Sequence, residues 1–273
     1  MPGHPRQVAL ARLASAPERA GFVTDFDGTL APIVNDPERA RAVPAALEAL
    51  GVLAKRLALV AVVSGRPVAF LRDHAAVDGV VLVGQYGLES VVAGEVVVDP
   101  RVEPFLGAVA GAADEAARVW PELFVERKGD VAFTVHWRTA PGAEPHPDAL
   151  ADLAARHGLE TQPGRMACEL RPPLPVDKGA AVSRLLDDHA MVETVAFAGD
   201  DRGDLPVFDR FDELSRLSDD AVADPDVWCI RIAVRSSEAP PELVQRADLI
   251  VDGPADLAEL LVELVSLLPG RPV

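Results

Sequence analysis

The sequence is poor in cysteine and has no long uncharged apolar run. Its 273 residues include two cysteines, Cys168 and Cys229, with neither a disulfide framework nor metal-ligand spacing. We therefore expect two reduced thiols in a reducing cytoplasm. No segment approaches the roughly 18 uncharged apolar residues of a membrane-spanning helix. The short apolar run near the N-terminus contains Arg12, so we expect no secretory signal, a cytoplasmic location and no membrane partner.

Positive charge is also scarce. The 26 Lys and Arg residues are outnumbered by 43 Asp and Glu residues, which gives a formal net charge of −17. A nucleic-acid-binding protein needs a basic surface, so this class of protein is not expected. Only three of the basic residues are lysines, namely Lys55, Lys128 and Lys178. An anionic substrate would need a local positive pocket on this acidic protein, which makes each lysine a candidate for a specific role.

About half of the residues are apolar, which is enough for a large core. Apolar strands that end in polar turns alternate with helices, a pattern that predicts a mainly parallel sheet. The strands of this pattern are predicted at 21–24, 57–63, 80–83, 194–198, 228–234 and 248–251. Its helices are predicted at 44–55, 177–189 and 257–268, and a short β–turn–β segment at 90–93 and 96–98.

The pattern changes near residue 100. A helix is predicted at 102–120, a hairpin at 123–126 and 131–137, a helix at 148–157 and a strand at 165–170. This block has the size of a small inserted α+β domain. We therefore predict a Rossmann-like α/β core, residues 1–100 and 173–273, with an α+β cap at 101–172.

Polar turns follow three of the predicted parallel strands. They are Asp25 to Thr29, Ser64 to Arg66, and Gly199 to Asp204. In open α/β sheets, ligands bind beyond the carboxyl ends of the strands. Several carboxylates would gather there, and like charges are costly together unless a cation holds them. Oxygen ligands suit a hard ion, most simply Mg²⁺.

The first of these turns has the residues that phosphoryl transfer needs. In an extended segment the side chains of Asp25 and Asp27 lean to the same side, and Gly28 allows a sharp turn beside a ligand. A carboxylate can act as nucleophile and split the reaction into two steps, provided that a metal and a lysine offset its charge. Asp27 is placed to protonate the leaving alkoxide.

The sequence resembles the haloacid-dehalogenase-type phosphatases in four motifs, which occur along the chain in the same order as in that family. Asp25 to Thr29 matches the first motif, Asp-x-Asp-Gly-Thr, and Ser64 matches the second, a Ser or Thr at a strand end. Lys178 in Asp177-Lys178-Gly179 matches the third, a Lys that opens a helix, and Gly199 to Asp204 matches the fourth, an acidic cluster. The resemblance implies a haloacid-dehalogenase-like core and an aspartyl-phosphate intermediate.

The resemblance also implies roles for the matched residues. Asp25 would be the nucleophile, and Asp27 the general acid and then base. Asp25, Asp27 (through its backbone carbonyl) and Asp200 would hold Mg²⁺, while Ser64 and Lys178 would hold the phosphoryl oxygens. The other motif residues expected at the site are Gly28, Gly65 and Arg66 for the substrate, with Asp201 and Asp204 in support.

Within that superfamily the chain resembles the trehalose-6-phosphate phosphatases along its whole length. The cap segments that carry the likeness are Glu126-Arg-Lys128, Val135 to Arg138, and Glu169 to Pro172. The likeness implies that Glu126, Lys128, Arg138 and Glu169 bind the distal sugar, since carboxylates and cations read sugar hydroxyls well. The alternative for Glu126 and Lys128 is an ordinary solvated ion pair. Four positions depart from the family pattern, namely Gln85, Tyr86, Gly203 and Leu205.

The expected reaction is hydrolysis of a sugar phosphate monoester, trehalose 6-phosphate, by a monomer or weak dimer. One alternative is the same chemistry on another glycosyl phosphate, such as glucosylglycerate phosphate or a pseudo-disaccharide phosphate. A phosphomutase would return the phosphoryl group to a sugar. A phospho-accepting signalling domain would be shorter and would need no cap. A non-catalytic sugar-phosphate sensor would be expected to lack one of the catalytic motif residues, and none is missing.

Overall fold

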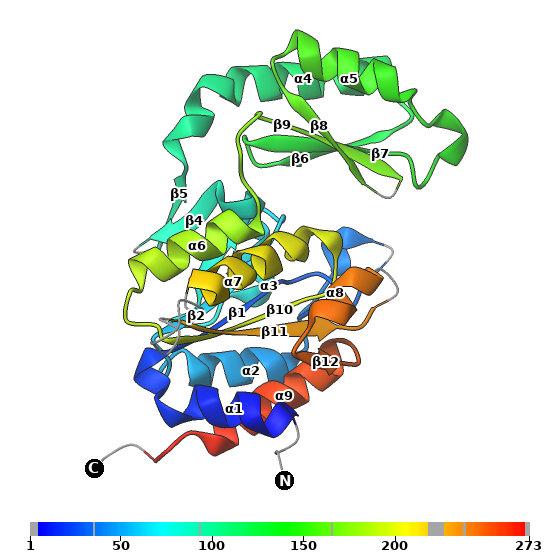
Figure 1. Cartoon of the computed structure of the whole chain (residues 1–273). Coiled ribbons are helices and arrows are strands. Elements are labelled where there is room, and N and C mark those ends of the chain that lie inside the picture. The colour runs from blue at the N-terminus through cyan, green and yellow to red at the C-terminus, as the bar shows by residue number, and fades with distance from the viewer. Residues whose placement is uncertain are drawn as a thin grey trace. The chain divides into compact units, whose positions relative to one another are not determined.

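The computed structural model describes residues 5–34, 36–92, 94–164, 166–217, 227–236 and 239–270. The chain divides into two compact units, Met1–Val91 with Asp177–Val273, and Val92–Val176 (Figure 1). We call them the core unit and the inserted unit. The sequence pattern places the boundaries at about 101 and 172 instead, because a change of pattern does not reveal which unit a connecting segment contacts. Ala93 and Arg165, at the ends of two predicted strands, lie outside the described residues.

The first sheet has the strand order β12-β11-β10-β1-β2-β3-β4-β5. Its strands are β1 (Ala20–Thr24), β2 (Leu59–Val63), β3 (Val81–Gly84), β4 (Glu89–Val92), β5 (Glu95–Val98), β10 (Thr194–Gly199), β11 (Trp228–Val234) and β12 (Leu249–Val251). Every pair from β12 to β3 is parallel, and β4 runs antiparallel to β3. The predicted mainly parallel sheet is therefore confirmed.

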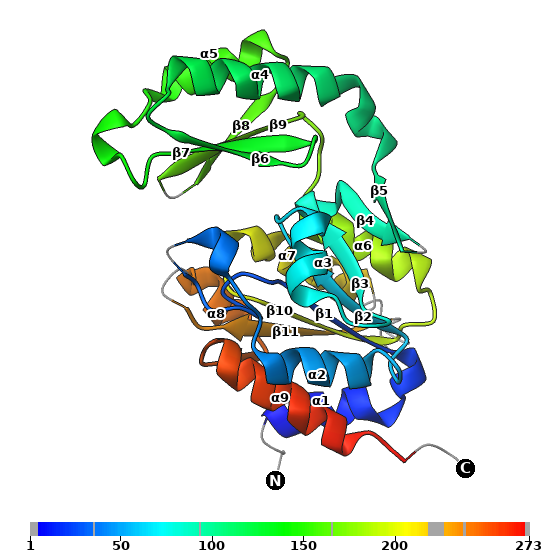
Figure 2. The same cartoon turned by 180° about the vertical axis from the view of Figure 1, so that it is seen from behind.

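Helices cover both faces of this sheet. One apolar cluster joins α1 (Pro5–Ser15), α2 (Pro44–Leu53), α3 (Val68–Ala75) and α9 (Gly253–Leu267) to one face. A second cluster joins α6 (Lys178–Asp188), α7 (Leu205–Leu217) and α8 (Pro241–Arg246) to the other. Figure 2 shows α1, α2 and α9 together on one side. Strands buried on both faces read as continuous apolar runs, which is why the sequence revealed them.

Antiparallel strands form the sheet of the inserted unit, in the order β6-β7-β9-β8. Its strands are β6 (Phe124–Lys128), β7 (Ala132–His136), β8 (Glu160–Gly164) and β9 (Ala167–Arg171). Helices α4 (Leu106–Val119) and α5 (Pro147–Arg156) cover one face, where their apolar side chains join those of β7 and β9 (Figure 1).

In the inserted unit, the start of one predicted helix was wrong and one strand was not predicted. The helix predicted from residue 102 begins as a 3₁₀ helix, Pro100–Phe105, and α4 starts only at Leu106, since Pro104 cannot donate a helical hydrogen bond. Strand β8 was not predicted, because it is polar and contains Pro163. As an edge strand it tolerates a proline.

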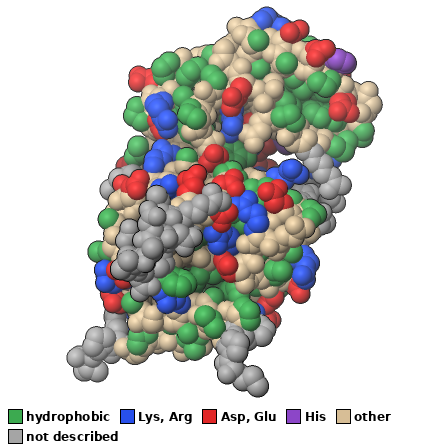
Figure 3. Space-filling view, viewed as in Figure 1, with side chains coloured by type: hydrophobic (Ala, Val, Ile, Leu, Met, Phe, Trp, Pro, Cys, Tyr) green, Lys and Arg blue, Asp and Glu red, His purple; other side chains and the backbone are tan. Residues whose placement is uncertain are grey.

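Within the described ranges, no helix is long and apolar enough to cross a membrane. On the face drawn in Figure 3, the Lys and Arg side chains are scattered among Asp and Glu side chains.

Candidate active site

The three polar turns named above lie at one edge of the core sheet. Strand β1 lies between β10 and β2, and all three are parallel, so their carboxyl ends meet. The backbone N–H of Asp25, just beyond β1, donates a 2.9 Å hydrogen bond to the carbonyl of Ala198 in β10. Ala198 precedes the fourth motif, and Thr29 Oγ1 of the first motif donates to Oδ1 of Asp200 in the fourth, so the fold brings these two motifs into direct contact.

Gly28 allows the chain to turn tightly against Asp200. Its φ is +75°, and a Cβ built there would lie 2.0 Å from Oδ2 of Asp200. Positive φ is costly for residues with a side chain. Two independent constraints, backbone conformation and space, thus require glycine here.

We predict that Gly28→Ala lowers kcat/KM about 10²-fold, the scale expected when a catalytic group is displaced by about 1 Å. Gly158→Ala is the matched control, because Gly158 also has a positive φ, +65°, but a Cβ there would meet no atom within 4 Å. Both variants carry the backbone strain, and only the first displaces Asp200. Comparison of phosphate release and thermal unfolding separates the two effects, and equal activity in both variants would contradict the assigned contact.

Lys178 is buried among carboxylates at the start of α6. Its Nζ lies 2.8 Å from Oδ1 of Asp25 and donates a 2.6 Å hydrogen bond to Oδ1 of Asp204. Lys178 and Asp25 are each 3% exposed. Asp177 caps the helix, accepting a 2.8 Å hydrogen bond from the N–H of Ala180. The lysine therefore supplies a fixed positive charge beside Asp25, at a helix N-terminus whose N–H groups also favour anions.

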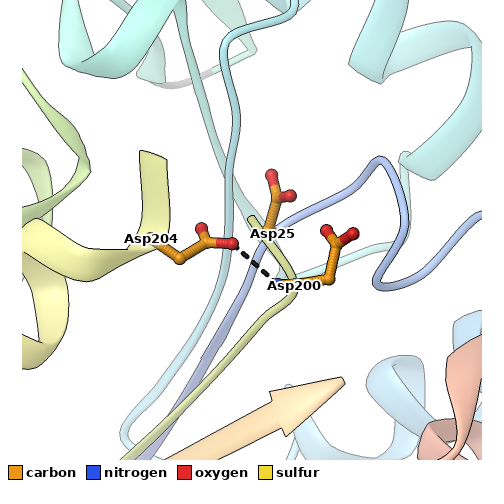
Figure 4. A group of neighbouring side chains, drawn as sticks. All are labelled: Asp25, Asp200 and Asp204. Atoms are coloured by element: carbon orange, nitrogen blue, oxygen red, sulfur yellow. Dashed lines mark hydrogen bonds between the residues drawn. The ribbon is translucent and has the colours of Figure 1, made fainter. Parts of the chain in front are cut away.

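Asp204 has both carboxylate oxygens occupied. Oδ1 accepts from Lys178, and Oδ2 accepts from the backbone N–H groups of Asp200 at 2.7 Å and Asp201 at 3.0 Å. Figure 4 shows this carboxylate turned toward the Asp200 backbone, while the carboxylates of Asp25 and Asp200 point to one side. Asp204 thus holds the loop and the lysine in position.

Three buried aspartates form a group that could hold a cation. Asp25, Asp200 and Asp204 each offer a carboxylate oxygen within 4.8 Å of the others. Asp200 is held by two hydroxyl donors, Thr29 Oγ1 at 3.3 Å from Oδ1 and Ser236 Oγ at 2.8 Å from Oδ2. Asp204 is bound to the Lys178 ammonium and to two backbone N–H groups, whereas the carboxylates of Asp25 and Asp200 point to one side (Figure 4), so Asp25 and Asp200 are better suited to a metal.

The electrostatics of this group also fit a cation. Burial raises the pKa of Asp25 well above its usual value, although Lys178 opposes the shift. Burial likewise raises the pKa of Asp200 to about 7 and that of Asp204 to about 6. Burial disfavours the ammonium of Lys178, but Asp204 and Asp25 outweigh it and raise its pKa. A lysine alone leaves the carboxylates under-compensated, and a divalent cation would supply the missing charge.

Arg66 is bound to Asp27. Its Nε donates to Oδ2 at 2.7 Å and its Nη2 to Oδ1 at 2.9 Å, a bidentate pair that fixes the plane of the carboxylate. The guanidinium also lies 4.4 Å over the ring of Phe70. The side chain of Asp27 is therefore placed outside the three-aspartate group, and Arg66 orients it, a contact that the sequence did not predict.

Ser64 and Gly65 border the same edge. Ser64 is buried, and its Oγ accepts a 3.2 Å hydrogen bond from the N–H of Arg66. A Cβ at Gly65 would lie 2.6 Å from the ring of Tyr86, so glycine is needed where this ring packs. Tyr86 and Gln85 both have positive φ, +57° and +51°. Two of the departures from the family pattern thus form a left-handed turn against the second motif.

The other two departures lie in and after the fourth motif. Leu205 opens α7 and packs against the apolar cluster on that face of the sheet. A Cβ at Gly203 would lie 3.1 Å from Oδ1 of Asp201, a tight contact. The 3₁₀ turn Arg202–Asp204 has a capping box, in which the side chain of Asp201 accepts from the backbone N–H of Asp204 and the side chain of Asp204 accepts from the backbone N–H of Asp201.

Three of the four expected sugar-binding residues share one face of the inserted sheet. Lys128 forms an ion pair with Oε2 of Glu169, and Oε2 of Glu126 lies 2.7 Å from Nε2 of His136. Lys128 therefore does form an ion pair, but with Glu169, and this pair is largely buried rather than solvated. Arg138 follows β7 and is exposed.

A model of the trehalose-phosphatase family matches residues 23–228. A curated trehalose-phosphate phosphatase of Mycobacterium leprae (strain TN) is 32% identical over 228 residues, which cover 78% of this chain and 50% of that protein. The chain thus spans about half the length of this curated relative.

Solved structures agree in fold. The C-terminal domain of a C. albicans trehalose-6-phosphate phosphatase matches with a TM-score of 0.73 and 24% identity, covering 97% of this chain and 98% of that one. A haloacid dehalogenase-like hydrolase from Bacteroides thetaiotaomicron matches with a TM-score of 0.56 and 16% identity, over 90% and 99% of the two chains. With a family model that matches most of its length, the chain belongs to the trehalose-phosphatase family.

Proposed function

We propose that this chain hydrolyses a sugar phosphate monoester, trehalose 6-phosphate, to trehalose and phosphate. The observation that supports this most strongly is Asp25, buried at the sheet edge with Lys178 at 2.8 Å and Asp200 beside it. A buried carboxylate paired with a lysine and a second carboxylate is suited to attack on phosphorus, and the family membership points to the substrate.

In the first step, an oxygen of Asp25 attacks phosphorus, and the bond from phosphorus to the sugar oxygen breaks. Lys178 offsets the charge of the carboxylate and of the phosphoryl oxygens. Asp27 donates a proton to the departing alkoxide, for which one of its oxygens must leave the bidentate contact with Arg66 that orients the carboxylate. The products of this step are the free sugar and an aspartyl-phosphate.

In the second step, Asp27 accepts a proton from water, whose oxygen attacks phosphorus. The bond between Asp25 and phosphorus breaks, phosphate leaves, and the Asp25 carboxylate is restored. Ser64 lies at the end of the neighbouring strand, where its hydroxyl group can donate to a phosphoryl oxygen. Gly28 and Gly65 leave room for two neighbours that border the site, the Asp200 carboxylate and the Tyr86 ring.

We assign Mg²⁺ to this group, where Asp25, Asp200 and the backbone carbonyl of Asp27 would hold it. The buried carboxylates with raised pKa values fit such an ion, because they need a cation and offer only oxygen. When bound, it would neutralise charge on the phosphoryl group. Asp201 and Asp204 support this arrangement through the loop that carries Asp200.

The sugar that does not carry the phosphate would be bound by Glu126, Lys128, Arg138 and Glu169. Another glycosyl phosphate is the second candidate substrate, because Gln85 and Tyr86 depart from the family pattern and form the left-handed turn that packs on Gly65. The test is phosphate release from trehalose 6-phosphate, glucose 6-phosphate, other glycosyl phosphates and p-nitrophenyl phosphate, with Mg²⁺ present. A preference for glucose 6-phosphate would refute the trehalose assignment and leave a general phosphatase.

In the same panel, Lys128→Ala should lower kcat/KM for trehalose 6-phosphate about ten- to a hundredfold. A charged hydrogen bond contributes roughly 1.5–3 kcal/mol, and each 1.4 kcal/mol is about tenfold in rate. Activity on p-nitrophenyl phosphate, which has no distal sugar, should stay near that of wild type. Equal losses on both substrates would show that Lys128 is structural.

A further inference from the structure

A row of polar side chains crosses all four strands of the inserted sheet. Glu126 of β6 lies opposite Thr134 of β7, Thr134 opposite Glu169 of β9, and Glu169 opposite Gln162 of β8. Residues directly opposite on paired strands point to the same face. The alternate residues of β7 and β9, such as Phe133 and Leu170, pack on the helices. The row therefore lies on the face away from α4 and α5.

Three oxygens of this row are buried without a hydrogen-bond partner. They are Oγ1 of Thr134, Oε1 of Glu169 and Oε1 of Gln162. In the part of the chain that the structure describes, only three further buried side-chain polar atoms lack a partner, so half of all such atoms lie in this one row. An unpaired buried polar atom is costly and calls for a specific explanation, such as a ligand that pairs with it.

The chemistry of the row and its surroundings matches a saccharide. Glu169 and Gln162 offer acceptor oxygens, and the Thr134 hydroxyl group can donate and accept, as sugar hydroxyls do. The neighbouring row has Phe124 stacked on His136, with ring centroids 5.7 Å apart and planes at 27°. Phe124 is 59% exposed. An aromatic surface beside convergent polar groups suits a sugar ring, which has an apolar face and a polar edge.

We propose that Thr134 and Gln162 are specificity-determining residues that bind hydroxyl groups of the distal sugar, beside Glu126, Lys128 and Glu169. This inference rests on the proposed function. Glu126 lies opposite Thr134, and Lys128 pairs with Glu169. Both carry long side chains with rotatable ends, so changes of rotamer can open these neighbouring oxygens to a sugar. The unpaired oxygens are then satisfied in the complex, and a ligand lacking these hydroxyls leaves them unpaired.

The test compares Thr134→Val and Gln162→Leu with the control Thr161→Val. Thr161 lies opposite Leu170, so the control removes the same hydroxyl group from the helix-covered face. For trehalose 6-phosphate, Thr134→Val and Gln162→Leu should each lower kcat/KM about three- to tenfold. Activity on p-nitrophenyl phosphate should not change. Thr134→Val should also have an unchanged or higher Tm, because it removes an unpaired buried oxygen.

Three outcomes would overturn the inference: no loss in either variant, an equal loss in the Thr161→Val control, or a lower Tm for Thr134→Val. The last would show that the hydroxyl group stabilises the fold. A wrong substrate assignment would be recognised separately. In that case the wild-type protein would release phosphate from p-nitrophenyl phosphate but not from trehalose 6-phosphate. The variants are then compared on the glycosyl phosphate that wild type prefers, where the same loss supports the inference and no loss overturns it.

Discussion

Asp25→Asn should abolish turnover, with a loss of at least about 10⁴-fold, the scale seen when a covalent nucleophile is removed. The amide keeps the shape of the side chain and loses the negative charge that attacks phosphorus. Asp25 is buried beside Lys178, and burial raises the pKa of Asp25, so keeping this carboxylate charged in the core costs folding free energy. The variant should therefore fold, and its Tm should not fall greatly.

The measurement is phosphate release from p-nitrophenyl phosphate and trehalose 6-phosphate, together with thermal unfolding. Asp73→Asn is the matched control, since Asp73 is exposed on α3 in the same unit, and it should retain wild-type activity. Activity of Asp25→Asn within tenfold of wild type would remove Asp25 from the role of nucleophile. A variant that is inactive because it is unfolded would be recognised from its melting curve.

Removal of divalent metal should abolish activity, and Mg²⁺ should restore it, with Ca²⁺ a poor substitute. Asp25, Asp200 and Asp204 place buried carboxylate oxygens within 4.8 Å of one another, and Lys178 compensates only part of their charge. Mg²⁺ requires near-octahedral geometry, whereas Ca²⁺ takes more ligands at longer distances and holds them less rigidly. Full activity in excess chelator would contradict the metal assignment.

Thermal unfolding gives a readout of the metal that does not depend on turnover. A ligand that binds only the folded state stabilises it by about 2.7 kcal/mol at a hundred times its Kd. Mg²⁺ should therefore raise the Tm of wild type, and Asp200→Asn should lose most of that shift. Asp73→Asn should keep the shift, because Asp73 is exposed on α3 and does not belong to the three-aspartate group. An equal shift in wild type and Asp200→Asn would show that Mg²⁺ stabilises the protein elsewhere.

The sequence alone was enough to predict the core sheet and the residues at its carboxyl edge. These strands can be recognised in the sequence as continuous apolar runs, because parallel strands buried on both faces carry few polar residues. Once β1, β2 and β10 are recognised as parallel, Asp25, Ser64 and Asp200 must end at the same edge. Asp177 marks the start of the helix that begins at Lys178, but only the resemblance to the third family motif placed Lys178 at this edge.

Pairings between distant residues could not be predicted in this way. Arg66 binds Asp27 and Ser236 binds Asp200, although 39 and 36 residues separate the partners. Both contacts depend on which strands are neighbours in the sheet. The close packing of Tyr86 on Gly65 depends in addition on two residues with positive φ.

The inserted unit shows the same limit most clearly. Its sequence has Glu126 and Lys128 two residues apart, which places them on one face of a strand. Only the register of β6, β7, β9 and β8 places Thr134, Glu169 and Gln162 in line with Glu126. A shift of one residue in any of these pairings would turn a strand's side chains to the other face. The sequence therefore determined which residue types the unit carries, and the tertiary structure decided which of them meet, because cross-strand register is set by packing and turn geometry rather than by local pattern.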